Sequence, residues 1–129
     1  MKDGILTGVG GKIHHFHQVG STMDIARELA RGGAAEGTVV AAERQTQGRG
    51  RLSREWQSPP GGIYFTIILR PRITPVYAPR LSLMASVAVA NTIRELLGLD
   101  ARLKWPNDVL IGGKKVCGIL AEMLSLIHI

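Results

Sequence analysis

The chain has 129 residues, of which 45% are hydrophobic, and this is the size and composition of one globular domain with a core. Its 16 Lys and Arg residues against 10 Asp and Glu give a formal net charge of +6, which favours a polyanionic partner: a nucleotide phosphate, a nucleic acid or an acidic protein. A single cysteine excludes an internal disulfide, and the apolar runs are too short for a membrane span, so we expect a cytoplasmic protein.

The first predicted elements are a strand at 12–19 and the helix that follows it. Ser21 suits the N-cap of this helix, and Asp24 stands where a capping box has its acidic residue. Apolar residues at helical spacing then continue to the paired glycines at 32–33, which end the helix. The apolar run at 38–42 predicts a buried strand.

A polar loop comes next, and it is the most informative segment of the sequence. It contains Gly48-Arg49-Gly50-Arg51-Leu52-Ser53-Arg54-Glu55-Trp56. Glycine lets the backbone approach a ligand closely, and arginine presents a planar, charged fork that matches phosphate or carboxylate. The segment 44–62 is therefore predicted to be a mobile loop that closes over an anion. A nucleic-acid-binding loop and a solvated connection are the alternatives.

The second half of the chain predicts four further elements. They are a strand at 63–69, a helix at 81–97, a strand that begins at 102–104, and a hairpin of strands 109–111 and 114–120 about the turn Gly112-Gly113. The apolar face expected of the helix consists of Leu81, Met84, Ala85, Ala88, Ile93, Leu96 and Leu97. Mixed strands and helices with antiparallel final elements favour an α+β or mixed α/β fold, and no linker divides the chain.

Two short motifs outside the loop also carry polar side chains with chemical potential. In Lys104-Trp105-Pro106-Asn107-Asp108 a lysine stands at a strand end, where it can meet a carboxylate or phosphate, and proline forces a turn. Asn107 and Asp108 either hold Mg²⁺ through oxygen atoms or cap the turn. The hydroxyls of Ser21 and Thr22 either cap the helix or bind a small polar ligand.

Three other features allow a functional and a structural interpretation. Gly118, inside an apolar strand, indicates either the close approach of a ligand or a β-bulge. Cys117 fits a buried core thiol better than a nucleophile. His15 and His17 share one face of a predicted strand, with His14 on the other, but no acidic residue or cysteine lies at a useful spacing, so a metal site is not expected.

Taken together and in this order, the motifs resemble those of the bacterial biotin–protein ligases. The resemblance runs from about Phe16 to Glu122 and is carried by Ser21-Thr22-Met23, Glu43 to Gln45, Gly48 to Arg51 with Arg54 and Trp56, Lys104 to Asp108, and Lys115 with Gly118 to Leu120. It implies a catalytic domain at 1–123 with a class II aminoacyl-tRNA synthetase-like α+β fold, in which helices pack on a mixed, largely antiparallel sheet. Met23 departs from the asparagine frequent at its position.

The resemblance also implies a two-step reaction. Biotin and ATP, with Mg²⁺, give biotinyl-5′-AMP, and a lysine of the biotin carboxyl carrier protein of acetyl-CoA carboxylase or another biotin-dependent carboxylase then takes the biotin. A lipoate– or octanoate–protein ligase of the same fold is the alternative, although lipoate ligases use a different arginine-glycine loop. A basic nucleic-acid-binding module is the non-enzymatic alternative.

Each matched residue receives a role from the resemblance. The catalytic residues would be Lys104, Arg51 and Arg49. The biotin-binding residues would be Ser21, Thr22, Gln45, Arg49, Gly50, Arg51, Lys104 and Gly118. ATP and the adenylate would meet Arg51, Arg54, Trp56 and Asn107, and Mg²⁺ would meet Asn107 and Asp108.

Both ends of the chain depart from the family pattern. The tail at 124–129 does not match the expected continuation, so we expect a C-terminally truncated catalytic domain that is weakly active or inactive. Few residues precede the first strand, so a helix-turn-helix domain, and with it DNA binding, is not expected. Relatives often pair through the catalytic domain, which makes a homodimer the expected assembly.

Overall fold

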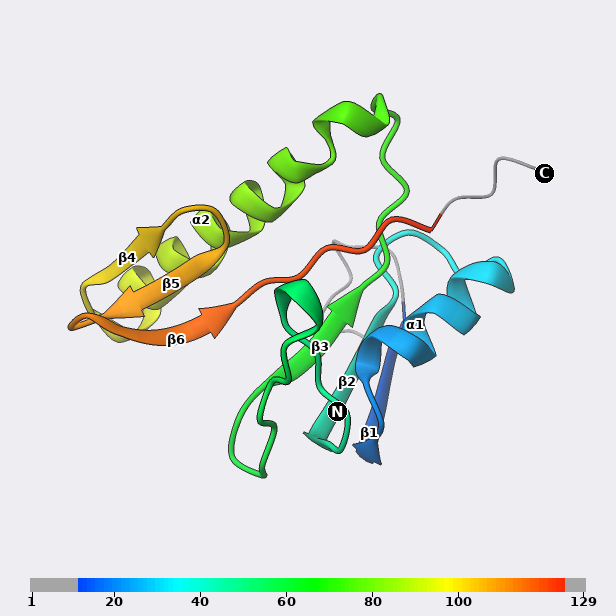
Figure 1. The fold of residues 1–129 in the computed structure, drawn as a ribbon, viewed down its shortest axis with the longest axis horizontal. Helices are drawn as coiled ribbons and strands as arrows, with labels where there is room; N and C mark the ends of the chain where they lie inside the picture. Colours follow the sequence, from blue (N-terminus) through cyan, green and yellow to red (C-terminus); the bar gives the residue numbers. More distant parts are fainter. Residues whose placement is uncertain (1–11, 125–129) are drawn as a thin grey trace. The chain divides into compact units, whose positions relative to one another are not determined.

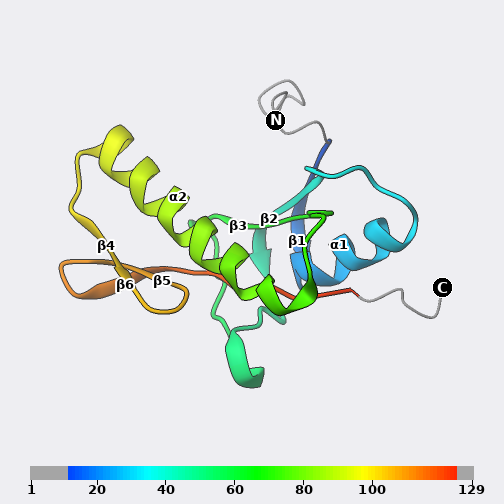
Figure 2. The same ribbon diagram turned by 90° about the horizontal axis from the view of Figure 1, so that it is seen from above.

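The computed structural model describes residues 12–124, and the chain divides between Pro71 and Arg72 into two compact units (Figure 1, Figure 2). The sequence predicts one domain at 1–123, with no dividing linker, whereas each unit has its own sheet and its own small core. The predicted domain boundary stays a prediction, because 125–129 of the non-matching tail lie outside the described residues.

The first unit is a three-stranded sheet with one helix. Its elements are β1 (Ile13–Val19), α1 (Thr22–Arg31), β2 (Val39–Gln45) and β3 (Tyr64–Ile67). The strand order is β1-β2-β3, with β1 parallel to β2 and β3 antiparallel to β2. Parallel strands need a crossover connection, and α1 supplies it (Figure 1).

Helix α1 begins and ends where the sequence predicts. Ser21 is extended, and its Oγ accepts a hydrogen bond from the backbone N–H of Met23 at 3.2 Å, so it is the N-cap. The predicted capping box is not formed as expected, because the carboxylate of Asp24 binds Arg49. At the other end, Arg70 donates hydrogen bonds from its guanidinium to the carbonyls of Ala30 and Ala34.

The core of the first unit joins one face of α1 to the sheet. Ala26, Val40 and Ile68 are buried together, and Phe16 packs against them. The prediction for β2 was too short. The sequence places Arg44 and Gln45 in the polar loop, but both pair with β1. Polar side chains do not prevent pairing, because the hydrogen bonds of a ladder come from the backbone.

The second unit is an antiparallel meander with one long helix. Its elements are α2 (Pro79–Leu97), β4 (Ala101–Lys104), β5 (Asp108–Ile111) and β6 (Lys114–Gly118), in the strand order β4-β5-β6. Helix α2 lies along one face of this sheet (Figure 1, Figure 2). The predicted turn is confirmed: Gly112 and Gly113 both have positive φ, 58° and 80°, as a type I′ turn requires.

The face that α2 buries matches the predicted one only in part. Ser86 and Ala90 are buried, and Ile93 packs against Ala101 and Val109 of the sheet. The large predicted face residues Met84, Leu96 and Leu97 are exposed. Small side chains let the helix approach the sheet closely. Within this unit, the size of the side chains therefore decides which residues of α2 are buried more than their hydrophobicity does.

The predicted fold class is confirmed. The described residues form α+β units in which β1 and β2 pair in parallel and the other strand pairs are antiparallel. The strands form two three-stranded sheets where one sheet was expected. Within 12–124, no helix has both the length and the apolar character needed to cross a membrane.

Candidate functional site

Predicted biotin-binding residues of the first unit meet at the N-terminus of α1. The side-chain oxygen of Gln45, at the end of β2, accepts hydrogen bonds from the backbone N–H of Thr22 at 2.9 Å and from its hydroxyl at 3.2 Å. Ser21 and Thr22 are both buried. Two motifs far apart in the sequence therefore form one polar cluster.

Two further hydroxyls that the sequence motifs do not include complete this cluster. The Oγ of Ser58 lies 3.0 Å from Nε2 of Gln45, and it also lies 3.0 Å from the backbone carbonyl of Trp56. The hydroxyl of Thr66, on β3, lies 2.8 Å from that of Thr22. An alternating pattern along β3 could have indicated Thr66, because it puts a polar residue on the face that carries Ile68.

The arginine-glycine loop is held by its own backbone. The N–H of Trp56 donates to the carbonyl of Gly48 at 2.8 Å, and the N–H of Gly50 donates to the carbonyl of Arg54 at 2.7 Å. At the tip, Leu52 and Ser53 have φ of 59° and 61°. In this structure the loop is a hydrogen-bonded, hairpin-like segment with a left-handed tip, and its predicted mobility stays a prediction.

The two glycines of the motif have different surroundings. A Cβ added at Gly48 would lie 2.5 Å from the carbonyl oxygen of Trp56 and 2.6 Å from the Oγ of Ser58. A Cβ added at Gly50 would lie 3.7 Å from the nearest atom, the carbonyl oxygen of Arg54. Only the first of these positions requires glycine for close packing.

The arginines of the loop divide into one that is anchored and two that are exposed. Arg49 forms an ion pair with Asp24, in the first turn of α1, with Nη1 and Oδ1 2.9 Å apart. Arg51 and Arg54 are exposed on the loop. The anchored side chain ties the loop to the helix, and the exposed ones keep their guanidinium groups available for an anion.

In the second unit, Lys104 and Asn107 bracket the turn between β4 and β5. Lys104 is exposed at the end of β4, as predicted. Asn107 is buried, and its side-chain amide donates to the carbonyl of Ile119, whose N–H donates to the carbonyl of Asn107 at 3.1 Å. Asn107 therefore fastens the turn to the chain after β6.

The predicted magnesium ligands both have protein partners in this structure, and their role as ligands stays a prediction. Oδ1 of Asp108 lies 3.0 Å from Nζ of Lys115, so a lysine neutralises part of the carboxylate charge. Asn107 donates to the carbonyl of Ile119 through its NH₂ group, and not through the amide oxygen that a metal would take. No group of three or more His, Cys, Asp or Glu side chains suited to a metal ion occurs among residues 12–124. Gly118 pairs with Asp108 across β5 and β6.

The remaining candidates have structural surroundings. Cys117 packs against the core of the second unit, and burial, with a smaller contribution from Asp108, raises the pKa of its thiol. His15 and His17 both face Glu43, with nitrogen–oxygen distances of 3.9 and 3.6 Å. The sequence missed this acidic neighbour because Glu43 lies on the adjacent strand rather than nearby in the chain.

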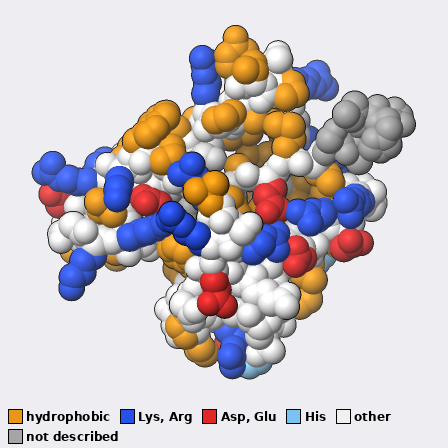
Figure 3. Space-filling view, viewed as in Figure 1, with side chains coloured by type: hydrophobic (Ala, Val, Ile, Leu, Met, Phe, Trp, Pro, Cys, Tyr) orange, Lys and Arg blue, Asp and Glu red, His pale blue; other side chains and the backbone are white. Residues whose placement is uncertain are grey.

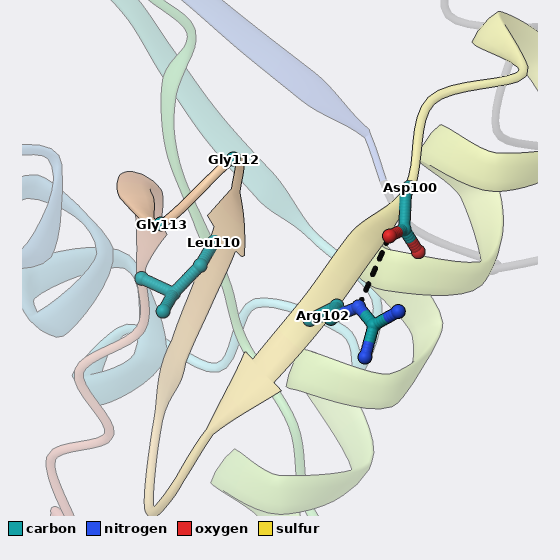
Figure 4. A pocket seen from close by; sticks show the side chains of 5 residues that line it. All are labelled: Asp100, Arg102, Leu110, Gly112 and Gly113. Carbon is teal, nitrogen blue, oxygen red and sulfur yellow. Dashed lines mark hydrogen bonds and ion pairs between the residues drawn. The ribbon is translucent and has the colours of Figure 1, made fainter.

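A cavity of about 200 Å³ lies in the second unit, away from the predicted residues. Its lining consists of Asp100, Arg102, Leu110, Gly112 and Gly113 (Figure 4). The guanidinium Nε of Arg102 lies 3.0 Å from Oδ2 of Asp100, so the charged groups of this cavity satisfy each other. We assign no function to it.

The fold is that of an α+β domain, and its polar clusters lie in the segments that carry the sequence motifs. The model of the Biotin/lipoate A/B protein ligase family matches residues 15–127, and the chain belongs to this family. The resemblance seen in the motifs is thereby confirmed.

Relatives and solved structures agree with this assignment. The Bifunctional ligase/repressor BirA of Bacillus subtilis is 49% identical over 122 residues, which are 93% of this chain and 38% of that protein. The Biotin–[acetyl-CoA-carboxylase] ligase of Paracoccus denitrificans is 44% identical, with 79% of this chain and 43% of that protein covered. The chain thus spans less than half the length of either relative.

Among solved structures, the biotin protein ligase from Aquifex aeolicus in complex with biotin and ATP superposes with a TM-score of 0.78 at 37% identity. That match covers 86% of this chain and 46% of the other. The enzyme from Leishmania major in complex with biotinyl-5-AMP gives a TM-score of 0.74 at 33% identity, with coverages of 84% and 50%.

Proposed function

We propose that this chain forms the biotin- and nucleotide-binding part of an ATP-dependent biotin–protein ligase. The observation that carries the proposal is the joining of Thr22 to Gln45 beside a loop with two exposed arginines, Arg51 and Arg54. The same family includes proteins whose structures hold biotin with ATP, or biotinyl-5-AMP.

The proposed reaction has two steps. The carboxylate of biotin attacks the α-phosphate of ATP. This step forms biotinyl-5′-AMP and releases pyrophosphate. The amine of a lysine on a biotin carboxyl carrier protein then attacks the mixed anhydride, so that an amide forms and AMP leaves. Carrier proteins of acetyl-CoA carboxylase or another biotin-dependent carboxylase are the proposed acceptors, in keeping with the name of the Paracoccus relative.

The proposed roles follow from charge and from the resemblance of the motifs. Carboxylate and triphosphate repel each other, and the cations Arg51, Arg54 and Lys104 would offset that charge as it redistributes in the transition state. The polar cluster of Ser21, Thr22 and Gln45 would bind the ureido ring of biotin by hydrogen bonds.

The remaining roles rest on the resemblance and the local geometry. Arg49 and the backbone of Gly50 would line the biotin site, with Arg49 positioned by Asp24. Trp56 would contact the adenylate. Gly118 would let biotin approach the β6 backbone. The hydrogen bond from the NH₂ group of Asn107 to Ile119 would hold the turn, and its amide oxygen would be the atom that meets the nucleotide.

Magnesium is proposed to come with the nucleotide. Mg²⁺ commonly binds substrate phosphates together with few protein ligands and several waters. The ion pair of Asp108 with Lys115 argues against a dedicated site at the turn. ATP would thus supply the oxygen ligands, and the cations Arg51 and Lys104 would act on the remaining phosphate charge.

Two alternatives are distinguishable by experiment. The family name includes lipoate ligases, so a lipoate or octanoate substrate is the alternative within the fold. A nucleic-acid-binding module is the non-enzymatic alternative, and it predicts salt-dependent affinity for DNA or RNA. The face drawn in Figure 3 carries Asp and Glu side chains as well as Lys and Arg. We favour the ligase because the motifs and the family match agree.

The deciding experiment measures adenylate formation by the full-length gene product. Biotin-dependent exchange of pyrophosphate into ATP is expected, with lipoate and octanoate as competitors. Arg51→Ala should lower the rate about 100-fold, as loss of one transition-state donor does. Arg72→Ala, which removes an exposed arginine outside the proposed site, serves as the matched control. Exchange that depends on lipoate and not on biotin would refute the proposal.

Location and assembly are proposed on the same basis. The cytoplasm, expected from the sequence, is the proposed location. The homodimer implied by the resemblance is tested by the mass of the full-length gene product in solution. The name of the Bacillus relative also includes the word repressor, and the function that this word describes is a property of that protein.

A further inference from the structure

Ser58 is a buried polar residue outside every motif that carries the resemblance. It is 5% exposed and follows the arginine-glycine loop. Its Oγ lies 3.0 Å from Nε2 of Gln45 and 3.0 Å from the backbone carbonyl of Trp56. A buried hydroxyl between Gln45, a proposed biotin-binding residue, and the loop backbone can fix the positions of both.

The chemistry of these groups fixes which way the hydrogen bonds run. A backbone carbonyl can only accept, so the hydroxyl of Ser58 donates its proton to the carbonyl of Trp56. The same hydroxyl oxygen is then an acceptor toward Gln45, which must present its NH₂ group on that side. The orientation of the Gln45 amide is thereby determined from the loop side.

The other end of the amide gives the same answer independently. The backbone N–H of Thr22 can only donate, so the oxygen of Gln45 must face it, at 2.9 Å. The hydroxyl of Thr22 donates to the same oxygen, and its own oxygen must therefore accept from Thr66. A one-way hydrogen-bond chain runs from β3 through Gln45 to the loop.

We propose that Ser58 is a positioning residue for the biotin site, which acts by holding the plane and orientation of the Gln45 amide. This inference rests on the proposed function. The Gln45 side chain has three rotatable bonds, and rotation about the last one turns the amide plane. Without Ser58, the NH₂ end of the amide loses its fixed acceptor. The bonds to Thr22 would then hold one end only, and the amide would present its polar atoms to biotin in several orientations.

The test compares biotin and ATP affinities in the full-length gene product. Ser58→Ala should raise the KM for biotin about three- to tenfold, the effect of losing one hydrogen bond, with the KM for ATP unchanged. Ser58→Cys, which replaces the hydroxyl by a slightly larger thiol that hydrogen-bonds weakly, should shift the same constant in the same direction. Ser86→Ala is the matched control, because Ser86 is also buried and donates to a backbone carbonyl.

A double-mutant cycle separates positioning from a general structural effect. Gln45→Met removes the amide, so Ser58→Ala should add nothing to its biotin defect if Ser58 acts through Gln45. Additive effects, or equal changes in the KM for biotin and for ATP, would overturn the inference. A wild-type protein that makes no biotinyl-AMP would overturn the proposed function as well, whereas an active wild type with a Ser58→Ala variant like Ser86→Ala would overturn the inference alone.

Discussion

The two glycines of the arginine-glycine motif should respond very differently to the same substitution. At Gly48 the methyl group of alanine would lie 2.5 Å from the carbonyl oxygen of Trp56 and 2.9 Å from Nε2 of Gln45. At Gly50 it would meet only ordinary contacts, and φ there is −108°, which alanine adopts readily. Gly50→Ala is thus a matched control within the same motif.

The size of the effect at Gly48 follows from what would have to move. The N–H of Trp56 donates to the carbonyl of Gly48 at 2.8 Å, so the two backbone segments cannot separate without losing that bond. Overpacking costs about 1–3 kcal/mol, and one lost hydrogen bond costs about 0.5–1.5 kcal/mol. Gly48→Ala should therefore lower the free energy of unfolding by about 2–4 kcal/mol.

Urea-induced unfolding followed by circular dichroism measures this difference. With a typical slope for a small protein, the midpoint should fall by about 1–2 M for Gly48→Ala. The free energy of unfolding of Gly50→Ala should stay within about 0.5 kcal/mol of the wild-type value, as for a surface substitution. Equal midpoints for the two variants would refute the packing described around Gly48.

Two further predictions concern the end of α1 and the thiol. Arg70→Ala should destabilise the protein by about 1–2 kcal/mol, since the guanidinium binds the carbonyl of Ala30 in the last turn of α1 and that of Ala34 after it, whereas Arg72→Ala should have no measurable effect on the urea midpoint. Burial raises the pKa of Cys117, so its contribution to stability is complete below the pKa of the unfolded thiol and is lost as the pH rises through the folded one. Near the ordinary pKa of a thiol, native protein should react with iodoacetamide more slowly than urea-unfolded protein, and equal rates would contradict this.

The local signals of the sequence predict much of the fold. Ser21 is a helix N-cap because of its side chain and its place before an amphipathic run. Gly112-Gly113 makes a tight turn because that turn requires positive φ at both residues, which glycine adopts readily. These features depend on neighbours in the chain. The set of residues that α2 buries does not depend on chain neighbours in this way, because Ser86 and Ala90 are buried where the helix comes close to the sheet.

The candidate site shows the same division. The motifs identify Thr22, Gln45 and the loop, but they give no reason to single out Ser58, whose position is set by how the loop returns to β2. They also treat Gly48 and Gly50 alike, although only the first faces a carbonyl at close range. Such distinctions depend on tertiary contacts that sequence spacing does not encode.

The two sheets differ in how far apart in the chain their paired strands lie. Ile13 pairs with Val39, and Val39 with Ile67, so each pairing in β1-β2-β3 closes a long stretch of chain. In β4-β5-β6, Ile111 pairs with Lys114 across a two-residue turn. Long loops cost more entropy to close before their contacts form, and non-local pairing slows folding. During refolding, β4-β5-β6 should therefore form before β1-β2-β3.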